Sequence, residues 1–393
     1  MLASVAALKH PEACNRALGA PVRWRRWGFL LLWLCAACAG PDANVPSLTL
    51  DEIAKERRHQ EIVQLQDYFA QLNKLNTVAY RITTANREFC KKWVVAQLGM
   101  VAATPQSLPS KYRKFSREAL GLRWVRATII SIVPDGPAAK AGVIDKDELV
   151  SFNGEHVPVT ATARWLNAFL EDNSERPITV VLHRDDEDKT VTITPVIGCA
   201  IPVTLETNPD PNAFTDFKKI VIQTGILRMT KTDSDLAVIV GHELGHVTMG
   251  HYDKRQINGL IGALGGTAID GGFLLGGIST GGAFTGYLQS AGLVAFSVGF
   301  EMEADYVGAY YAARAGYDIS GAEEVWRTLS LEMPASIRIA TTHPTTPVRY
   351  LQMRKVIEEI AEKKRKNEPL LPNLKSAKAE DAPAPELPRE RND

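Results

Sequence analysis

The sequence predicts an α+β protein in which a mostly helical domain with a small sheet is interrupted by a β-rich insert. Apolar residues recur every three or four positions over roughly residues 50–88 and again after Thr232, which is the spacing of amphipathic helices. Residues 119–198 instead hold short apolar runs separated by turn residues, as β-strands do. Together these two patterns predict the fold class.

The composition of the chain excludes several kinds of protein. The chain has 393 residues, of which 45% are hydrophobic and 23% are charged, so it is neither wholly disordered nor a polytopic membrane protein. Lys plus Arg and Asp plus Glu number 45 each, and this balance gives no indication of a nucleic acid partner. Five cysteines without a repeated CxxC pattern exclude a small disulfide scaffold and a cysteine-based zinc ribbon.

Residues 1–38 are predicted to be an export signal. Three arginines between positions 23 and 26 precede the apolar run 27–38, which is too short to span a bilayer comfortably. Cys38 follows two alanines and resembles the acylated cysteine of bacterial lipoproteins, with Ala39 favouring the outer membrane. We therefore expect a lipid-anchored periplasmic protein; a plain secretory signal is the alternative.

Two cysteines, Cys90 and Cys199, remain after cleavage and acylation. Cysteines in an oxidising compartment usually pair, so we predict a disulfide between them, the alternative being two buried free thiols. Such a bridge would hold both ends of the β-rich insert together, as expected for one domain inserted into another.

The segment 39–118 is predicted to be the N-terminal helical part of the larger domain. Thr49 and Glu52 have the spacing of a capping box at the start of the helix near 50–88. We expect this helix to form one wall of a core, although a coiled-coil partner helix would show the same pattern.

The insert, residues 119–198, is similar to the PDZ domains of bacterial proteases. The similarity rests on the stretch 134–143 and on Asn153-Gly154 shortly after it. Strands are expected at 127–133, 148–152, 178–183 and 190–196, and a helix at 161–170. PDZ domains bind extended peptides and hold the C-terminal carboxylate with backbone amides, here expected near Gly121-Leu122. A docking domain without an open groove is the alternative.

The segment 199–365 carries the residues that indicate chemistry. A capping box at Thr232 opens a helix that contains His242-Glu243-Leu244-Gly245-His246. Residues four apart share a helical face, so His242 and His246 can reach one metal ion. Zinc favours imidazole and carboxylate ligands, and Glu243 is placed to act as the general base.

A second helix supplies candidate carboxylates. Glu301 and Asp305 lie four residues apart, so one can bind the metal while the other orients an imidazole. A solvated acidic helix start would look the same. His251 lies one position away from the third histidine of the metzincin pattern, and we expect it to be structural.

Together these motifs resemble the zinc metallopeptidase family of the CAAX prenyl proteases, HtpX and BepA. The matching motifs lie at 212–225, 241–247 and 301–305. The resemblance implies a gluzincin-type fold over 50–118 and 199–365. It also implies one Zn²⁺ per chain held by His242, His246 and Glu301, with Asp305 behind them.

The same resemblance implies roles for residues farther along the chain. His343 would be either a latch on the metal or a hydrogen-bond donor to the transition state, and a plain capping turn is the alternative. Arg349 would lie close to the metal as a catalytic residue. The strand containing Ile220, Val221 and Ile222 would pair with the backbone of the substrate.

Two further segments stand out by composition. Asp270 is the one charged residue between Gln256 and Phe300, and glycines are dense there. We expect mobile apolar segments near the cleft that cover it or touch the membrane surface, or else segments buried in the protein. Residues 366–393 are predicted to be a disordered tail.

The resemblance therefore implies a zinc-dependent endopeptidase of the bacterial cell envelope that cleaves misfolded or unassembled proteins by metal-activated water. Its partners would be unfolded or membrane-associated substrates, and peptide C-termini at the PDZ-like domain. A PDZ-mediated chaperone with a latent or vestigial metal site is one alternative, and a lipid-anchored assembly scaffold is another. The intact Glu243 argues against a vestigial site.

Overall fold

The computed structural model describes residues 43, 45–91, 93–108, 110–160, 162–172, 176–216, 218–275, 278–294, 297–332 and 347–375. The chain divides into two compact units, Met1–Lys55 and Glu56–Asp393, and the second contains every site discussed below. The predictions for the export signal, Cys38 and His343 lie outside the described residues. Within the described part, no helix combines the length and apolarity needed to cross a membrane.

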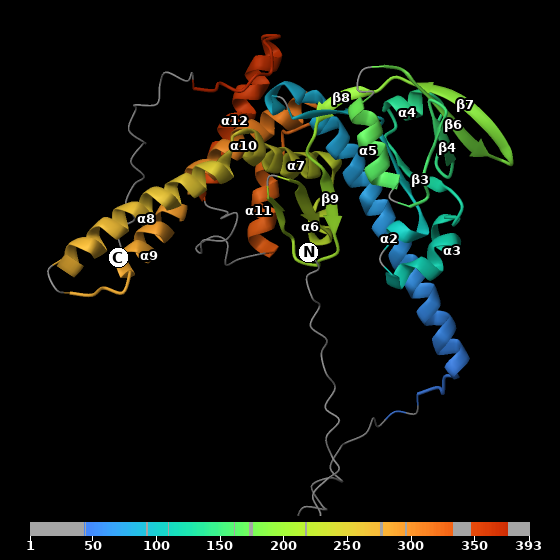
Figure 1. The fold of residues 1–393 in the computed structure, drawn as a ribbon, viewed down its shortest axis with the longest axis horizontal. Coiled ribbons are helices and arrows are strands. Elements are labelled where there is room, and N and C mark those ends of the chain that lie inside the picture. The colour runs from blue at the N-terminus through green and yellow to red at the C-terminus, as the bar shows by residue number, and fades with distance from the viewer. Residues whose placement is uncertain are drawn as a thin grey trace, which may run out of the picture. The chain divides into compact units, whose positions relative to one another are not determined.

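The larger domain is mostly helical (Figure 1). Its helices are α2 (Leu50–Ala85), α6 (Thr224–Met229), α7 (Asp233–Thr248), α8 (His251–Leu275), α9 (Ala283–Val294), α10 (Ser297–Arg314), α11 (Ala322–Glu332) and α12 (Pro347–Arg365). The predicted capping box at the start of α2 is present, with Glu52 accepting from the Thr49 amide and hydroxyl. The predicted helix ends three residues early, where a 3₁₀ turn (Arg87–Cys90) follows.

A small sheet accompanies these helices. Its strands are β9 (Val203–Glu206), β10 (Ala213–Thr215) and β11 (Ile220–Gln223), in the order β10-β11-β9. The central strand β11 pairs antiparallel with β10 and parallel with β9. The prediction that Ile220, Val221 and Ile222 pair with substrate is therefore wrong, because both edges of β11 already carry neighbouring strands.

One hydrophobic core joins the sheet to the helices. It contains Leu75, Val78 and Ile82 of α2, Ile220 and Ile222 of β11, Leu236, Val240 and Leu244 of α7, Val307 and Tyr310 of α10, and Met353 and Val356 of α12. The expectation that α2 forms a wall of a core is confirmed. Residues 366–375, at the start of the predicted tail, contact this domain, since Arg314 donates to the Leu370 carbonyl and the Asn373 amide donates to Tyr306.

The insert forms a separate six-stranded sheet with its own core. Its strands are β2 (Met100–Ala103), β3 (Ala127–Ile132), β4 (Glu148–Phe152), β5 (Glu155–His156), β6 (Ile178–Arg184) and β7 (Glu187–Ile193), and its helices are α3 (Ser116–Leu120), α4 (Pro137–Lys140) and α5 (Thr162–Asp172). The β-rich region begins at Met100 rather than at residue 119, because β2 pairs with β3 as an edge strand of this sheet.

The prediction that Gly121 and Leu122 form the carboxylate-binding loop of the PDZ domain is also wrong. Both amides already donate within the α3 cap, from Gly121 to the Arg117 carbonyl and from Leu122 to the Ser116 carbonyl. The Leu122 side chain is fully buried. These amides are therefore occupied and cannot hold a peptide carboxylate.

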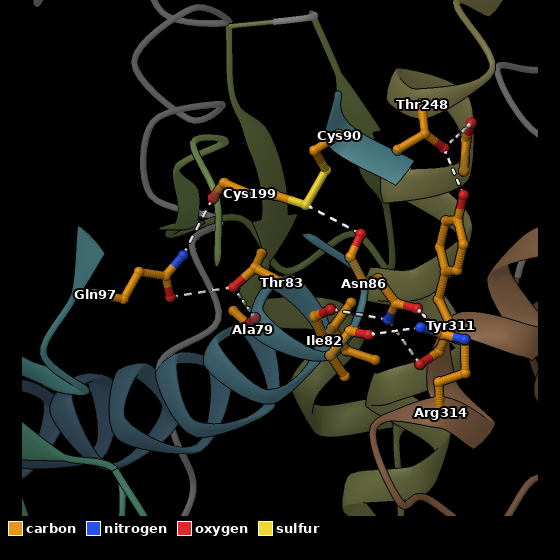
Figure 2. The surroundings of a disulfide bond; sticks show 12 residues. Ala79, Ile82, Thr83, Asn86, Cys90, Gln97, Cys199, Thr248, Tyr311 and Arg314 are labelled. Carbon is orange, nitrogen blue, oxygen red and sulfur yellow. Dashed lines mark hydrogen bonds between the residues drawn. A yellow bond between two sulfur atoms is a disulfide. The ribbon is translucent and has the colours of Figure 1, made fainter. Parts of the chain in front are cut away.

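The two ends of the insert lie side by side (Figure 2). Strands β1 (Val94–Gln97) and β8 (Val196–Cys199) pair antiparallel, and Cys90 and Cys199 form a disulfide with their Cα atoms 5.6 Å apart. Asn86 lies beside it, donating to the Tyr311 carbonyl and accepting from Arg314 of α10. The ends of the insert are thus tied to the helix that carries Glu301. Whether the bridge forms in the cell stays a prediction.

Candidate metal centre

Helix α7 carries the first two candidate ligands, and a capping box fixes the residue at which this helix begins. The Asp235 amide donates to the Thr232 hydroxyl at 3.1 Å, and the Thr232 amide donates to the Asp235 carboxylate at 2.9 Å. This satisfies two amides that a helix start would otherwise leave unpaired. His242 and His246 follow on one face of the helix, as the i, i+4 spacing predicts.

Glycines bring α7 and α10 unusually close together. A Cβ on Gly241 would lie 2.5 Å from the Gly308 carbonyl oxygen, and one on Gly308 would lie 2.6 Å from the His242 amide nitrogen. A Cβ on Gly245 would meet a Val307 methyl at 2.8 Å. Only glycine allows this backbone approach, which explains why the helix-weakening Gly245 stands beside the ligands. The contact places the start of α10 against the histidines.

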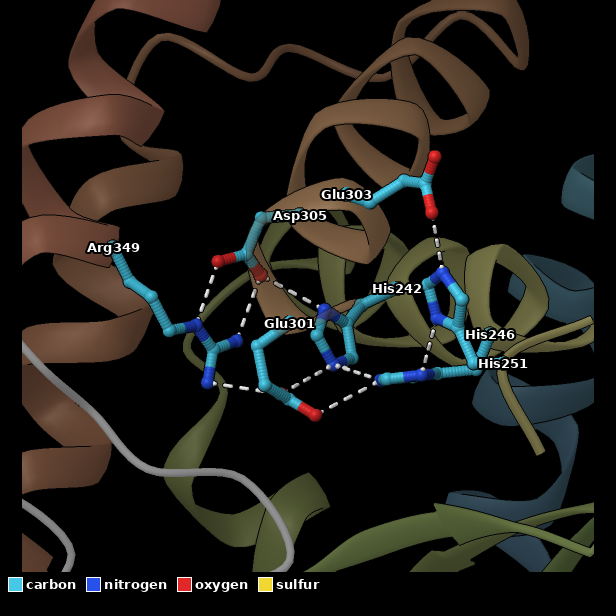
Figure 3. Close-up of polar contacts among 7 residues, drawn as sticks. All are labelled: His242, His246, His251, Glu301, Glu303, Asp305 and Arg349. Atoms are coloured by element: carbon cyan, nitrogen blue, oxygen red, sulfur yellow. Dashed lines mark hydrogen bonds and ion pairs between the residues drawn. The ribbon is translucent and has the colours of Figure 1, made fainter. Parts of the chain in front are cut away.

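His242, His246 and Glu301 converge on one point (Figure 3). The Nε2 atoms of the two histidines are 3.0 Å apart, and the Glu301 carboxylate oxygens lie 3.4 Å from His242 Nε2 and 3.3 Å from His246 Nε2. Two atoms bound to one tetrahedral zinc ion at 2.0–2.1 Å are separated by about 3.3 Å. The donor types and their spacing therefore fit a zinc ion.

A carboxylate and a guanidinium lie behind His242 (Figure 3). Asp305 Oδ1 is 2.8 Å from His242 Nδ1, and Arg349 bonds both Asp305 oxygens at 2.7 Å. Arg349 Nη1 also reaches Glu301 Oε2 at 3.1 Å. Burial alone would raise the pKa of Asp305, but the adjacent Arg349 outweighs it and holds this pKa below its usual value. Asp305 is therefore a charged acceptor for His242.

A second chain of contacts lies behind His246, and the sequence did not reveal it. His251 Nδ1 is 2.9 Å from His246 Nδ1, and His251 Nε2 is 2.8 Å from Glu303 Oε2. His251 is 2% exposed, which is consistent with the structural role expected for it. No role was predicted for Glu303 from the sequence. Its position two residues after Glu301, at the start of a helix, could have indicated that it lies near the metal ligands.

These contacts determine which nitrogens carry hydrogen. The ionised Asp305 only accepts, so His242 donates from Nδ1 and keeps its Nε2 lone pair. The Glu303 carboxylate likewise accepts a hydrogen bond from Nε2–H of His251. The other ring nitrogen of His251, Nδ1, then accepts a hydrogen bond from Nδ1–H of His246. In the ligating form of the site both Nε2 lone pairs consequently face Glu301. Burial lowers the pKa of His242, but its contacts with Asp305 and Glu301 outweigh this and raise it to about 9, so in the metal-free protein Nε2 also carries a hydrogen near neutral pH, which metal binding displaces.

Glu243 and Arg349, which the sequence predicted to be catalytic, lie beside the three converging ligands and are not among them. Glu243 is 1% exposed on α7, next to His242. Arg349 is also 1% exposed, and its guanidinium lies 4.5 Å from the centre of the Trp326 ring. Because Arg349 contacts the carboxylates behind and beside the ligands, the geometry favours a positioning role over the predicted catalytic one.

Comparison with known families agrees with this geometry. Residues 202–357, which contain all three converging side chains, match the model of peptidase family M48. Over these residues the chain is similar to peptidase family M48. Residues 100–194 match a PDZ domain, which confirms the expected PDZ insert and its start at β2.

Curated relatives match over part of their length. Over 170 residues the chain is 28% identical to the mitochondrial metalloendopeptidase OMA1 of Schizosaccharomyces pombe, covering 41% of this chain and 47% of that protein. It is 31% identical over 166 residues to OMA1 of Arabidopsis thaliana, with coverages of 41% and 33%. It is 30% identical over 124 residues to the beta-barrel assembly-enhancing protease of Yersinia pestis, with coverages of 29% and 25%. The matched region thus spans less than half of each of these relatives.

A cavity of about 570 Å³ lies between the PDZ domain and the M48 region. It is lined by residues 97–101, which run from the end of β1 into β2, by Leu166 and Leu170 of α5, and by Asn76 and Tyr80 of α2. The edge strand and the helix of the PDZ domain therefore face a hollow that α2, a core helix of the larger domain, also lines.

Proposed function

We propose that this chain is a zinc-dependent endopeptidase of the bacterial cell envelope. The observation that carries the proposal is the convergence of His242, His246 and Glu301 at separations that suit one tetrahedral metal ion. The match of residues 202–357 to a peptidase family supports it. Misfolded or unassembled envelope proteins are the proposed substrates.

Each residue of the site has a part in the proposed chemistry. A bound zinc ion would act as a Lewis acid that polarises the peptide carbonyl and lowers the pKa of water. Glu243 takes the proton of the attacking water and delivers it to the leaving amine. Asp305 and the His251–Glu303 pair hold the two imidazoles in the ligating tautomer. Arg349 keeps Asp305 ionised in a buried site and also contacts Glu301.

The substrate backbone is proposed to pair with β10. Within the described residues β10 has a strand, β11, on one side, and it packs next to α7. An extended substrate added to its free edge would lie along the helix that carries Glu243. Pairing through the backbone selects weakly among side chains, which suits a peptidase that removes many different damaged proteins.

The PDZ domain is proposed to capture peptide C-termini. The cavity beside β2 and α5 provides an edge strand for backbone pairing and apolar side chains for the terminal residue. Its further lining by α2 places a bound peptide against a helix of the peptidase core. Substrates could thus be held at one end while another segment enters the cleft.

The envelope location is a proposal supported by the sequence. The apolar run before Cys38 has the pattern of an export signal, and the Cys90–Cys199 disulfide suits an oxidising compartment. We propose a lipid anchor at Cys38 in the outer membrane. His343 remains either a latch on the metal or a donor to the transition state, two roles with opposite effects on the rate when it is removed.

The test is metal content and peptide hydrolysis of wild type and Glu243→Gln. We expect about one zinc ion per chain in both proteins. The amide cannot accept the proton of the water, so hydrolysis should fall by about 10²–10⁴-fold in Glu243→Gln. A chelator should abolish wild-type hydrolysis, and added zinc should restore it.

Glu358→Gln in α12 is a matched control, because it changes the same side chain outside the metal cluster and should retain full activity. Equal hydrolysis by wild type and Glu243→Gln, with zinc bound in both, would overturn the assignment of the base. Zinc-loaded wild type that binds unfolded protein but never cleaves it would favour the chaperone alternative.

A further inference from the structure

Helices α8 and α9 lie side by side as a hairpin (Figure 1), and the hairpin has large apolar side chains on its outside. The two helices pack mainly against each other. Six large side chains of the hairpin are between 60% and 92% exposed: Leu260, Ile261, Leu264, Leu274, Leu275 and Tyr287. The alternative given in the sequence analysis, that this segment is buried inside the protein, is therefore wrong. A hairpin in water normally turns such residues inward.

Charge is almost absent from the hairpin. Asp270 is the one charged residue between Gln256 and Phe300. Its carboxylate accepts hydrogen bonds from the Thr280 hydroxyl and from the Thr285 hydroxyl and amide, so it is turned toward α9. Beyond the first turn of α8, which holds Asp253, Lys254 and Arg255, the outer faces consequently carry no ionised group, whereas water-facing helices carry many.

The interior of the hairpin is built from small residues. A Cβ on Gly262 would lie 2.0 Å from the Leu288 carbonyl oxygen, and one on Gly266 would lie 2.4 Å from the Phe284 carbonyl oxygen. Helix pairs held by such close backbone contacts are typical of apolar solvents, where burying large apolar side chains between helices brings no gain. The hairpin therefore has small and polar groups inside and large apolar groups outside, which is the arrangement expected of helices in contact with lipid.

From these observations we propose that the α8–α9 hairpin inserts its outer surface into one leaflet of a lipid bilayer. The apolar surface is not one narrow stripe, because the exposed Leu264 and Ile269 are five positions apart and lie on different faces of α8. A single protein groove would cover one stripe, whereas acyl chains cover every face. At the base of α8 the exposed Lys254 and Arg255 lie beside Asp253, and Lys254 Nζ is 3.7 Å from Glu303 Oε2, so charged side chains of both signs would lie at the level of the lipid headgroups.

The insertion has a consequence for the peptidase. Helix α8 begins five residues after His246, and α9 is followed by α10, which carries Glu301. The hairpin therefore connects the two halves of the metal cluster and would hold the site near the bilayer surface. Segments of substrate emerging from the membrane would be within its reach. The insertion itself does not depend on the proposed peptidase activity.

The experiment is flotation of the full chain with vesicles of phosphatidylethanolamine and phosphatidylglycerol. Cys38→Ser is introduced throughout so that no acyl chain contributes. The double variant Leu264→Glu, Leu274→Glu should lose at least about tenfold in vesicle binding, because each carboxylate opposes insertion. Val125→Glu, at a 65% exposed apolar position of the PDZ domain, is the matched control and should bind like wild type. Hydrolysis of a soluble peptide should be equal in all three proteins.

A second measurement reports depth directly. Beyond the signal of the seven native tryptophans, measured on the parent protein, Tyr287→Trp should show a fluorescence blue shift with vesicles and quenching by brominated acyl chains, since position 287 is 71% exposed in the structure. Three results would overturn the proposal: no flotation of wild type, equal flotation of wild type and the double variant, or a wild-type dimer that the double variant dissociates without any vesicle binding. The last would assign the surface to a second copy of the chain.

Discussion

The pairs α7–α10 and α8–α9 are built on the same contact but have opposite surroundings. In both, glycines let one helix touch the backbone of the other, at Gly241 and Gly308 in the first pair and at Gly262 and Gly266 in the second. The first pair is covered by the sheet and α12 and holds paired charges in its interior. The second is exposed and apolar. Glycine contacts set how closely two helices approach, whereas the side chains around them decide which solvent they suit.

The sharpest test of this comparison removes one charged group that contacts the first pair and one that lies within the second. Arg349→Met, in α12, removes the guanidinium that bonds both Asp305 oxygens and leaves this buried carboxylate with His242 as its remaining partner, so we expect a loss of about 3–5 kcal/mol in the free energy of unfolding. Asp270→Asn in the hairpin should cost about 1 kcal/mol or less, because an amide oxygen can still accept some of the same hydrogen bonds. Chemical denaturation of the metal-free proteins measures both values.

Equal losses in the two variants would contradict the view that buried charge distinguishes the pairs. Arg349→Lys serves as the conservative control. It restores the positive charge but not both hydrogen bonds to Asp305, so its loss should fall between those of wild type and Arg349→Met.

The glycine contacts themselves can be tested separately in the two pairs. Gly241→Ala should cost about 1–3 kcal/mol and weaken zinc binding, because the new methyl group would force α10 and Glu301 away from the histidines. Gly266→Ala should open the hairpin and weaken vesicle binding while leaving zinc binding unchanged. Calorimetry and a zinc competition assay distinguish these outcomes.

Gly265→Ala is the control in the same helix. Its new Cβ would have a Leu288 methyl at 3.9 Å as its nearest neighbour, so the substitution should be neutral or slightly stabilising. A loss of zinc binding in Gly266→Ala would show that the two helix pairs are mechanically coupled, contrary to the comparison.

The smallest expected effect concerns the contacts behind His246. His251→Gln removes the imidazole that holds His246 Nδ1, and Glu303→Gln weakens the anchor of His251. We expect zinc affinity to fall by about 10–100-fold in His251→Gln and by less in Glu303→Gln. Glu301→Gln should exceed both because it changes a proposed ligand. Competition with a chromophoric chelator gives this order without any activity assay, and a reversed order would contradict it.

Much of this molecule could be predicted from local patterns. The capping box at Thr232, the spacing of His242 and His246, and the alternation of the PDZ strands each depend on residues close together in the sequence. Such features follow from the geometry of a single helix or hairpin, and the structure retains them. The pairing of β11 with strands on both sides, and the start of the insert at β2, escaped prediction because strand order depends on distant partners.

By itself, the sequence determined the chemistry available at the site: two imidazoles on one helix face, a carboxylate between them, and acids at the start of a later helix. The tertiary structure alone decided which acid reaches the imidazoles. The contact of Gly241 with Gly308 brings Glu301 into the cluster, sets Asp305 behind His242, and leaves Glu303 to hold His251. The physical reason is that a helix turns 100° per residue, so neighbouring acids point in different directions until packing against α7 selects among them.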